Sequence, residues 1–320
     1  MNIYDLVFQA EERIRPFIRE TPLEYSFYLS KLAECNVYLK LDNLQYTGSF
    51  KMRGATNKLL SLSNKERKKG VLAASTGNHG MGVAYGLRRF DIKGEIYLPE
   101  NSLPQKINML RDYGAELVFH GDDCAITEAY ARTVSTQTGK VFISPYNDEQ
   151  IIAGQGTLAV ELKRQLTNVD AVFVAVGGGG LISGIGGFLK EKNRRTQIIG
   201  CLPKNSPVMY ESIKAGEIVE MPALPTLSDG TAGGVEAGAI TFSLCQKYVD
   251  DWITVTEEEI ESAMRLVFEQ HRLVIEGAAG VAVAAFMRSQ NAQKFGKKAN
   301  VVIVLCGGNV DMEKFKSIVL

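Results

Sequence analysis

The stretch of sequence that decides the fold is Gly48-Ser49-Phe50-Lys51-Met52-Arg53-Gly54-Ala55. It places one lysine, Lys51, at the expected start of a helix that runs to about Leu62. A helix N-terminus already carries the positive end of the macrodipole, so a structural cation gains little there. We therefore expect the Lys51 amine to have a role other than that of a structural cation, and we expect the rest of the chain to be organised around it.

The composition excludes several classes of partner. The chain has 320 residues, which corresponds to about two domains with a large core. Lysine plus arginine and aspartate plus glutamate both number 36, so no basic surplus attracts nucleic acid or an anionic membrane. We expect the partners to be a small-molecule substrate and a second copy of the chain, with no nucleic acid and no membrane.

Several features predict a cytoplasmic protein. No apolar run reaches the roughly 18 to 20 residues of a membrane span, and the N-terminus carries Asp5, Glu11 and Glu12 instead of a secretion signal. The five cysteines are odd in number and widely spaced, which fits reduced thiols better than disulfides. No Cys-x-x-Cys pair is present, which argues against zinc. The cysteines are Cys35, Cys124, Cys201, Cys245 and Cys306.

From Gly70 onward, expected strands and helices alternate, which is typical of a mostly parallel α/β sheet. The expected strands are 37–41, 71–74, 95–98, 116–119, 141–143, 171–176, 197–202 and 300–305. The expected helices are 4–18, 51–62, 81–89, 104–113, 125–137, 151–166, 181–191, 208–214, 242–248, 257–271 and 278–288. The rhythm restarts near residues 144–150, so we predict two α/β units with open sheets and helices on both faces.

Four unusual loops lie at the ends of expected strands or at the Lys51 turn. Ligands of open parallel sheets sit beyond the carboxyl ends of the strands, so we expect these loops to converge on one cleft. The loops are Ser49-Phe50-Lys51, Ser75-Thr76-Gly77-Asn78-His79-Gly80, Gly177-Gly178-Gly179-Gly180 and Cys306-Gly307-Gly308-Asn309.

The four glycines Gly177, Gly178, Gly179 and Gly180 favour a phosphate site. Backbone without side chains approaches an anion closely and presents N–H groups beside the start of the next helix. The alternatives are a tight turn or the first turn of a dinucleotide fold. The dinucleotide fold requires an acidic residue at the end of the next strand, whereas this chain has Gly200-Cys201-Leu202 there.

Lys51 together with a phosphate cradle predicts pyridoxal phosphate, whose aldehyde needs an amine and whose phosphate needs such a loop. Without the cradle, Lys51 reads as an ordinary surface charge. Phe50 offers a wall for the flat ring, although core packing explains a single phenylalanine equally well. The hydroxyls and open backbone from Ser75 to His79 suit an amino-acid carboxylate, or else Ser75 or Thr76 caps the following helix.

Taken together, these motifs resemble the fold-type II pyridoxal-phosphate enzymes of the threonine/serine dehydratase and serine racemase family. The matching stretches are Ser-Phe-Lys-x-Arg-Gly-Ala, Ser-x-Gly-Asn-His, the four glycines and x-Gly-Gly-Asn. The chain is similar also to dehydratase-like proteins of hydroxyectoine utilisation. The resemblance implies a tryptophan synthase β-like fold, with a smaller mobile domain at 48–146 and a larger cofactor-binding domain at 1–47 plus 147–320.

The resemblance also implies roles for the residues in the motifs. Lys51 forms the Schiff base and removes the substrate's Cα proton, and Phe50 lies against the ring. Asn78 bonds the 3-hydroxyl, Gly177 to Gly180 hold the phosphate, and Cys306 lies at the pyridine nitrogen. The residues that face the substrate carboxylate are Ser75, Thr76, Asn78 and His79. The expected assembly is a homodimer.

The expected activity is loss of water and then ammonia from a β-hydroxy-α-amino acid. Racemases of this branch use a serine where this chain has Thr76, so a racemase is the alternative, followed by a non-catalytic cofactor-binding protein and, last, a dehydrogenase. Metal-activated relatives bind a cation after the strand that follows the glycines. The matching stretch, 201–208, has no carboxylate, so we expect no metal there.

Overall fold

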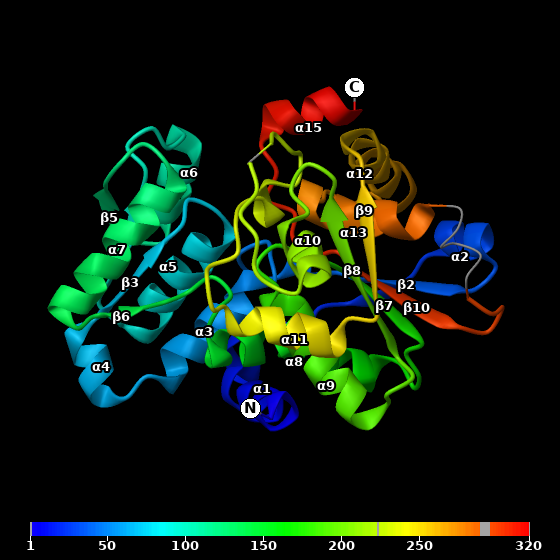
Figure 1. Ribbon diagram of the computed structural model, residues 1–320, viewed down its shortest axis with the longest axis horizontal. Coiled ribbons are helices and arrows are strands. Elements are labelled where there is room, and N and C mark those ends of the chain that lie inside the picture. Colours follow the sequence, from blue (N-terminus) through cyan, green and yellow to red (C-terminus); the bar gives the residue numbers. More distant parts are fainter. Residues whose placement is uncertain (1, 223, 289–294, 320) are drawn as a thin grey trace.

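The computed structural model describes residues 2–222, 224–288 and 295–319, and two sheets organise them (Figure 1). The strands are β1 (Leu23–Tyr25), β2 (Asn36–Lys40), β3 (Val71–Ala74), β4 (Gly94–Leu98), β5 (Glu116–Phe119), β6 (Val141–Phe142), β7 (Ala171–Ala175), β8 (Gln197–Pro203), β9 (Asp251–Val255) and β10 (Asn300–Val304). The α-helices are α1 (Ile3–Ile14), α2 (Phe27–Ala33), α3 (Lys51–Ser61), α4 (Asn64–Lys69), α5 (Asn78–Phe90), α6 (Pro104–Asp112), α7 (Cys124–Thr138), α8 (Glu149–Gln165), α9 (Gly180–Lys192), α10 (Val208–Ala215), α11 (Ile240–Tyr248), α12 (Glu257–His271), α13 (Gly277–Met287) and α15 (Met312–Val319). Short 3₁₀ turns occur at η1 (Arg15–Phe17), η2 (Asp42–Leu44) and η3 (Asp229–Thr231).

The larger sheet has six strands in the order β1-β2-β10-β7-β8-β9. All neighbours are parallel except β1, which pairs antiparallel with β2. Helices α1, α8, α9 and α11 form one layer, and α12 and α13 form the other (Figure 1). The carboxyl ends of β7 and β10 are therefore neighbours at one edge of a sheet that is covered on both faces.

The smaller sheet has four parallel strands in the order β5-β4-β3-β6. Helix α7 packs on one face, and α5 and α6 pack on the other. All four strands lie between residues 71 and 142, and the side chains on the α5 face form a hydrophobic cluster of their own. Helix α3 contacts both α5 and α8, so it lies between the two sheets.

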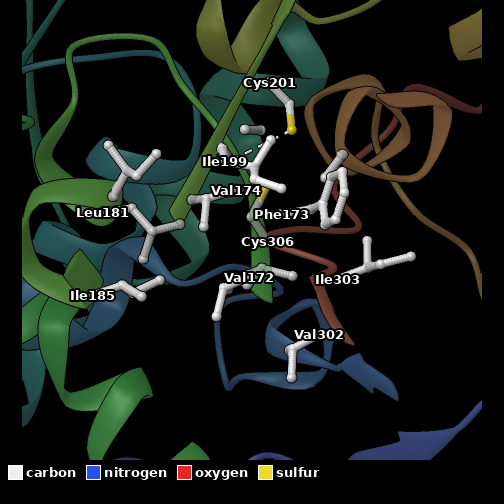
Figure 2. Packing of buried hydrophobic residues seen from close by; sticks show 14 of the residues in the cluster. Val172, Phe173, Val174, Leu181, Ile185, Ile199, Cys201, Val302, Ile303 and Cys306 are labelled. Atoms are coloured by element: carbon white, nitrogen blue, oxygen red, sulfur yellow. Dashed lines mark hydrogen bonds between the residues drawn. The ribbon is translucent and has the colours of Figure 1, made fainter. Parts of the chain in front are cut away.

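Burial on both faces explains the apolar central strands of the larger sheet. Every residue of β7 is buried, and Figure 2 shows Val172, Phe173 and Val174 packed among side chains of the neighbouring strands and of α9. The ring of Phe173 meets that of Phe286 on α13 edge-on, with their centres 5.4 Å apart. A strand covered on both sides reads as a continuous hydrophobic run because no face of it is solvated.

The structure confirms the predicted α/β class and corrects several element bounds. Helix α5 begins at Asn78, three residues before the predicted start at Met81, so Asn78 and His79 are helical. The elements that the sequence did not predict are β1, α2, α4, β9 and α15. Helix α4 is wholly polar and rests on a Ser63 capping box, so it has no apolar period to recognise. No helix in the described ranges is both long and apolar enough to cross a membrane.

Candidate active site

The loop before Lys51 is held against the end of β10. The Phe50 N–H donates to the Cys306 carbonyl at 2.9 Å, and the Gly308 N–H donates to the Gly48 carbonyl at 2.9 Å. Gly48 has a φ of +71°, which a side chain would strain. Helix α3 starts at Lys51, and its N-cap makes no side-chain bond. This two-stranded contact fixes the lysine beside Cys306.

The amine of Lys51 points into a partly buried site. Its Nζ donates to the Pro145 carbonyl at 2.8 Å and lies 5.3 Å from the centre of the Phe50 ring. Burial lowers the pKa of Lys51 to about 8, while Cys306 and Glu276 oppose that shift. A lysine with this pKa carries a substantial neutral fraction near physiological pH, which a nucleophile or a base requires.

The glycine loop lies between β7 and α9, as predicted. Gly179 is the N-cap of α9 with a φ of +83°. A Cβ at Gly177 would lie 3.0 Å from the Thr231 Cα, and a Cβ at Gly178 would lie 2.3 Å from the ring of Tyr146. The loop therefore tolerates only bare backbone, and it faces the start of a 13-residue helix, where free N–H groups bind anions.

Ser75 and Thr76 lie half-buried between β3 and α5. The N-cap of α5 is Gly77 and makes no side-chain capping bond, so neither hydroxyl caps the helix in the way the alternative required. The Ser75 Oγ instead accepts the Gly77 N–H at 3.2 Å. The N-terminus of α5 thus remains open toward the site, which suits a carboxylate.

The ring of His79 has a different environment from its neighbours. It is buried, and its Nε2 bonds the Ile143 carbonyl at 2.8 Å. Burial, together with the nearby Lys51, lowers the pKa of His79 to about 3, so the ring is neutral at physiological pH. Contact between His79 and a substrate carboxylate stays a prediction. Because the Nε2 of His79 already bonds Ile143, the main-chain N–H groups at the start of α5 are the donors available for that contact.

Asn78 belongs to a hydrogen-bonded group that the sequence did not predict. Its Nδ2 donates to both carboxylate oxygens of Glu276 at 2.9 Å, and its Oδ1 accepts from Asn309 Nδ2 at 2.8 Å. The predicted site residues do not include Glu276. The available signal was a single acidic residue immediately before the apolar run of α13, a position that packing buries.

Cys306 follows β10 and is 2% exposed. Burial raises the pKa of the Cys306 thiol well above its usual value, and Glu276 and Asp42 add to that shift, so the thiol stays protonated. Cys306 belongs to the same hydrophobic cluster as Val172, Phe173 and Val174, and Figure 2 draws it with them. The thiol is therefore a neutral group at the edge of the site.

One cavity of about 540 Å³ brings all the predicted site residues together. Its lining includes Phe50, Lys51, Ser75, Thr76, Asn78, His79, Gly177, Gly178, Gly179, Gly180 and Cys306. An amine, a side-chain-free anion cradle and a flat-ring wall in one cavity match the chemistry of pyridoxal phosphate. The individual roles of these residues stay predictions. Within the described part of the chain, no three His, Cys, Asp or Glu side chains gather in a way that would hold a metal ion.

Comparison with known proteins agrees with this chemistry. The family model described as "pyridoxal-phosphate dependent enzyme" matches residues 14–307. The L-threonine ammonia-lyase of Thermotoga maritima is 42% identical over 97% of this chain and 76% of its own length. The catabolic L-threonine dehydratase of Staphylococcus aureus is 38% identical over 97% of this chain and 90% of its own.

A solved structure extends the comparison to the fold. The serine racemase of Dictyostelium discoideum superposes with a TM-score of 0.90 at 35% identity, covering 97% of this chain and 99% of its own. The predicted resemblance and the predicted fold are therefore confirmed.

Proposed function

Since the chain belongs to the pyridoxal-phosphate-dependent enzyme family, we propose that it is a lyase that removes water and then ammonia from a β-hydroxy-α-amino acid. The product is a 2-oxo acid, and threonine and serine are the first substrates to examine. The observation that carries this proposal is the Lys51 amine, with a pKa near 8, in the same cavity as the glycine cradle. The similarity to an L-threonine ammonia-lyase and to an L-threonine dehydratase supports this reaction.

We propose that five groups in the cavity bind pyridoxal phosphate. Gly177 to Gly180 and the start of α9 would take the phosphate, Phe50 would line the ring, and the Lys51 amine would be the group that bonds the cofactor's aldehyde carbon. Asn78 would donate to the ring oxygen, and Cys306 would face the pyridine nitrogen. Bound pyridoxal phosphate supplies the electron sink that acidifies the substrate's Cα proton.

The proposed reaction needs three tasks from the chain. Backbone N–H groups at the start of α5, with the hydroxyls of Ser75 and Thr76, bind the carboxylate. Lys51 would accept the Cα proton and pass a proton to the β-hydroxyl, which would then depart as water, and hydrolysis of the resulting enamine would give the 2-oxo acid and ammonia. The neutral Cys306 thiol stabilises a pyridinium poorly, which favours prompt loss of the β-hydroxyl over transamination.

A substrate panel examines this proposal directly. Purified protein with added pyridoxal phosphate is expected to convert L-threonine or L-serine to the 2-oxo acid, and Lys51→Ala is expected to lose both the cofactor's visible absorbance band and turnover. Assays with and without magnesium examine the expected absence of metal activation. A bound cofactor without turnover of any hydroxyamino acid would instead favour the non-catalytic alternative.

The second candidate function is an amino-acid racemase. It is favoured by the likeness to the Dictyostelium serine racemase and by the place of Thr76, whose hydroxyl lines the same cavity as Lys51. Chiral analysis of the products separates the two candidates, because a racemase accumulates D-amino acid and a lyase accumulates the oxo acid. Thr76→Ala is expected to reduce any D-isomer more than it reduces the oxo acid.

We propose that residues 48–146 form a smaller domain that closes on the site. The separate sheet and cluster support this division, and two ion pairs join it to the loop after α10. The Nζ of Lys106 lies 3.8 Å from the Oδ2 of Asp229, and the Nη2 of Arg132 lies 2.7 Å from the Oε2 of Glu236. Helix α3 lies within residues 48–146 but is bound to the larger unit, because its buried Arg53 pairs with Asp42 and Glu161. Substrate-dependent protection of these segments from hydrogen exchange would support closure.

We also propose a cytoplasmic homodimer. An exposed apolar group on β1 and α2 supports a subunit contact, since Phe27 is 82% exposed and Tyr25, Tyr28 and Leu32 are also exposed. Light scattering of the protein is expected to give twice the chain mass, and Phe27→Asp is expected to shift it toward the monomer. All five cysteines are free thiols, which fits a reducing compartment.

A further inference from the structure

The carboxylate of Glu276 is a buried acid that the proposed reaction leaves without a task. Glu276 occupies the N-cap position of α13, yet its side chain makes no capping bond to that helix. It is 4% exposed and turns into the cavity instead. Gly307 leaves room for it, because a Cβ there would lie 2.3 Å from the carboxylate Oε1. The carboxylate of Glu276 therefore occupies space beside Gly307 and does not cap helix α13.

The bonds of Glu276 fix the orientation of one amide. Asn78 donates its Nδ2 to the carboxylate, while Asn309 donates its Nδ2 to the Asn78 Oδ1 and its main-chain N–H to Glu276 at 3.3 Å. Asn309 is held in turn by the Thr47 carbonyl at 2.8 Å. A side-chain amide nitrogen carries two hydrogens. The two oxygens of the Glu276 carboxylate lie on the same side of this nitrogen, each at 2.9 Å, and share one of its hydrogens, so the second N–H is left for a ligand in the cavity.

The charge of Glu276 is weakly compensated. Among the described residues its hydrogen-bond donors are the neutral groups of Asn78 and Asn309. The titratable groups that face it are Lys51 from α3, Asp229 from η3 and the Cys306 thiol. Burial raises the pKa of Glu276 to about 7, and the bonds from Asn78 oppose that shift. Its protonation state therefore changes close to physiological pH.

We propose that Glu276 is a positioning residue that acts through Asn78. Its carboxylate holds one N–H of the Asn78 amide, and Asn309 holds the amide oxygen, so the remaining N–H is directed to an oxygen acceptor on the cofactor ring. The charge on Glu276 sets how strongly that N–H donates. This inference rests on the proposed use of the cavity for pyridoxal phosphate.

The experiment compares holoenzyme variants without substrate. Glu276→Gln keeps an acceptor for Asn78 but removes the charge and the titration. The wild-type absorbance band of bound cofactor is expected to change with pH around neutrality, and in Glu276→Gln this transition is expected to vanish or to move by at least about one pH unit. Glu128→Gln is the matched control, since this acid lines the same cavity without contacting Asn78, and its transition is expected to match the wild type.

Asn309→Ser provides a second, independent measurement. It releases the Asn78 oxygen while leaving Glu276 in place, so the pH transition is expected to remain and the dissociation constant for pyridoxal phosphate to rise about tenfold, the equivalent of one lost hydrogen bond. A Glu276→Gln titration identical to wild type would overturn the inference, as would unchanged cofactor affinity in Asn309→Ser. If wild-type protein formed no absorbance band with pyridoxal phosphate, the proposed function itself would fail.

Discussion

Lys40 on β2 and Lys51 at the start of α3 both place a side-chain amine in the interior, but their neighbours differ. The Nζ of Lys40 donates to Glu161 at 2.6 Å, to the Thr21 carbonyl at 2.7 Å and to Gln165 at 3.0 Å. The Nζ of Lys51 donates to the Pro145 carbonyl at 2.8 Å. Burial lowers the pKa of both lysines, and only Lys40 has a carboxylate at bonding distance to oppose it.

The two buried glutamates show the same contrast. Although burial favours protonation of Glu161, Arg53 and Lys40 hold the pKa of its carboxyl well below the usual value. Glu276 receives only neutral donors, and its pKa rises to about 7. Arg53 also pairs with Asp42 at 2.7 Å, and it lies two residues after Lys51. The ionic network formed by Lys40, Asp42, Arg53 and Glu161 thus anchors α3, while the site beside it keeps groups whose charge can change.

The strongest way to sharpen this comparison is selective labelling of the two lysines. When cofactor-free protein is treated with pyridoxal phosphate and then with borohydride, peptide mapping is expected to find the adduct on Lys51 and none on Lys40. The initial rate is expected to rise with pH and reach its midpoint near 8, because only the neutral amine reacts. A midpoint near 10.5, the ordinary lysine value, would contradict the argument; Lys51→Ala controls for reaction elsewhere.

Removing one charge from the ionic network is expected to have the next largest effect. Glu161→Gln removes the carboxylate partner of the buried Lys40 and leaves Arg53 paired with Asp42 alone, which costs about 3–5 kcal/mol of the free energy of unfolding. Glu276→Gln is the matched variant in the site and is not expected to destabilise the cofactor-free protein at pH 7. Denaturant unfolding of both variants measures the difference. Equal losses would show that the two glutamates are not in different environments.

Ionisation of Glu161 and ionisation of Glu276 are expected to change the free energy of unfolding in opposite directions as the pH rises. Glu161, whose pKa is lowered, contributes stability above its ordinary value of 4.5 and loses it as pH falls. Glu276, whose pKa is raised, costs stability increasingly as pH rises from 4.5 to about 7. Cofactor-free Glu276→Gln is therefore expected to match wild type near pH 4.5 and to exceed it by up to about 3 kcal/mol above pH 7, at about 1.4 kcal/mol per pKa unit. A pH-independent difference between the two proteins would refute this assignment.

The predicted site residues share one cavity because the motifs that contain them are local. Lys51, the four glycines and Cys306 each adjoin a strand or helix end, and the parallel topology brings those ends to one edge of the sheet. Ser75 and Asn78 line the cavity for the same reason, since they follow the carboxyl end of β3. Apolar periodicity likewise located amphipathic helices such as α1 and α12, whereas α13 was predicted from a continuous apolar run.

The remaining features depend on packing between distant segments. Arg53 and Glu161 are 108 residues apart, and no local pattern states that α3 and α8 are neighbours. Glu276 gains its role only because α13 buries it beside Asn78, which lies 198 residues earlier. The three-residue edge strand β1 and the polar helix α4 lack a sustained apolar period, so their sequences did not distinguish them from loops.

The smallest expected effect comes from the rim of the ionic network. Arg15 bonds Glu161 at 2.5 Å, but its side chain is 27% exposed, whereas Arg53 is fully buried. Water therefore replaces much of the interaction when Arg15 is removed, and Arg15→Gln is expected to cost about 1 kcal/mol or less of the free energy of unfolding. Rising salt should shrink that loss further, because an exposed pair is screened, while the loss from Glu161→Gln should persist. If Arg15→Gln cost as much as Glu161→Gln in the same denaturant series, the network would extend to the surface as one unit, and burial alone would not separate its members.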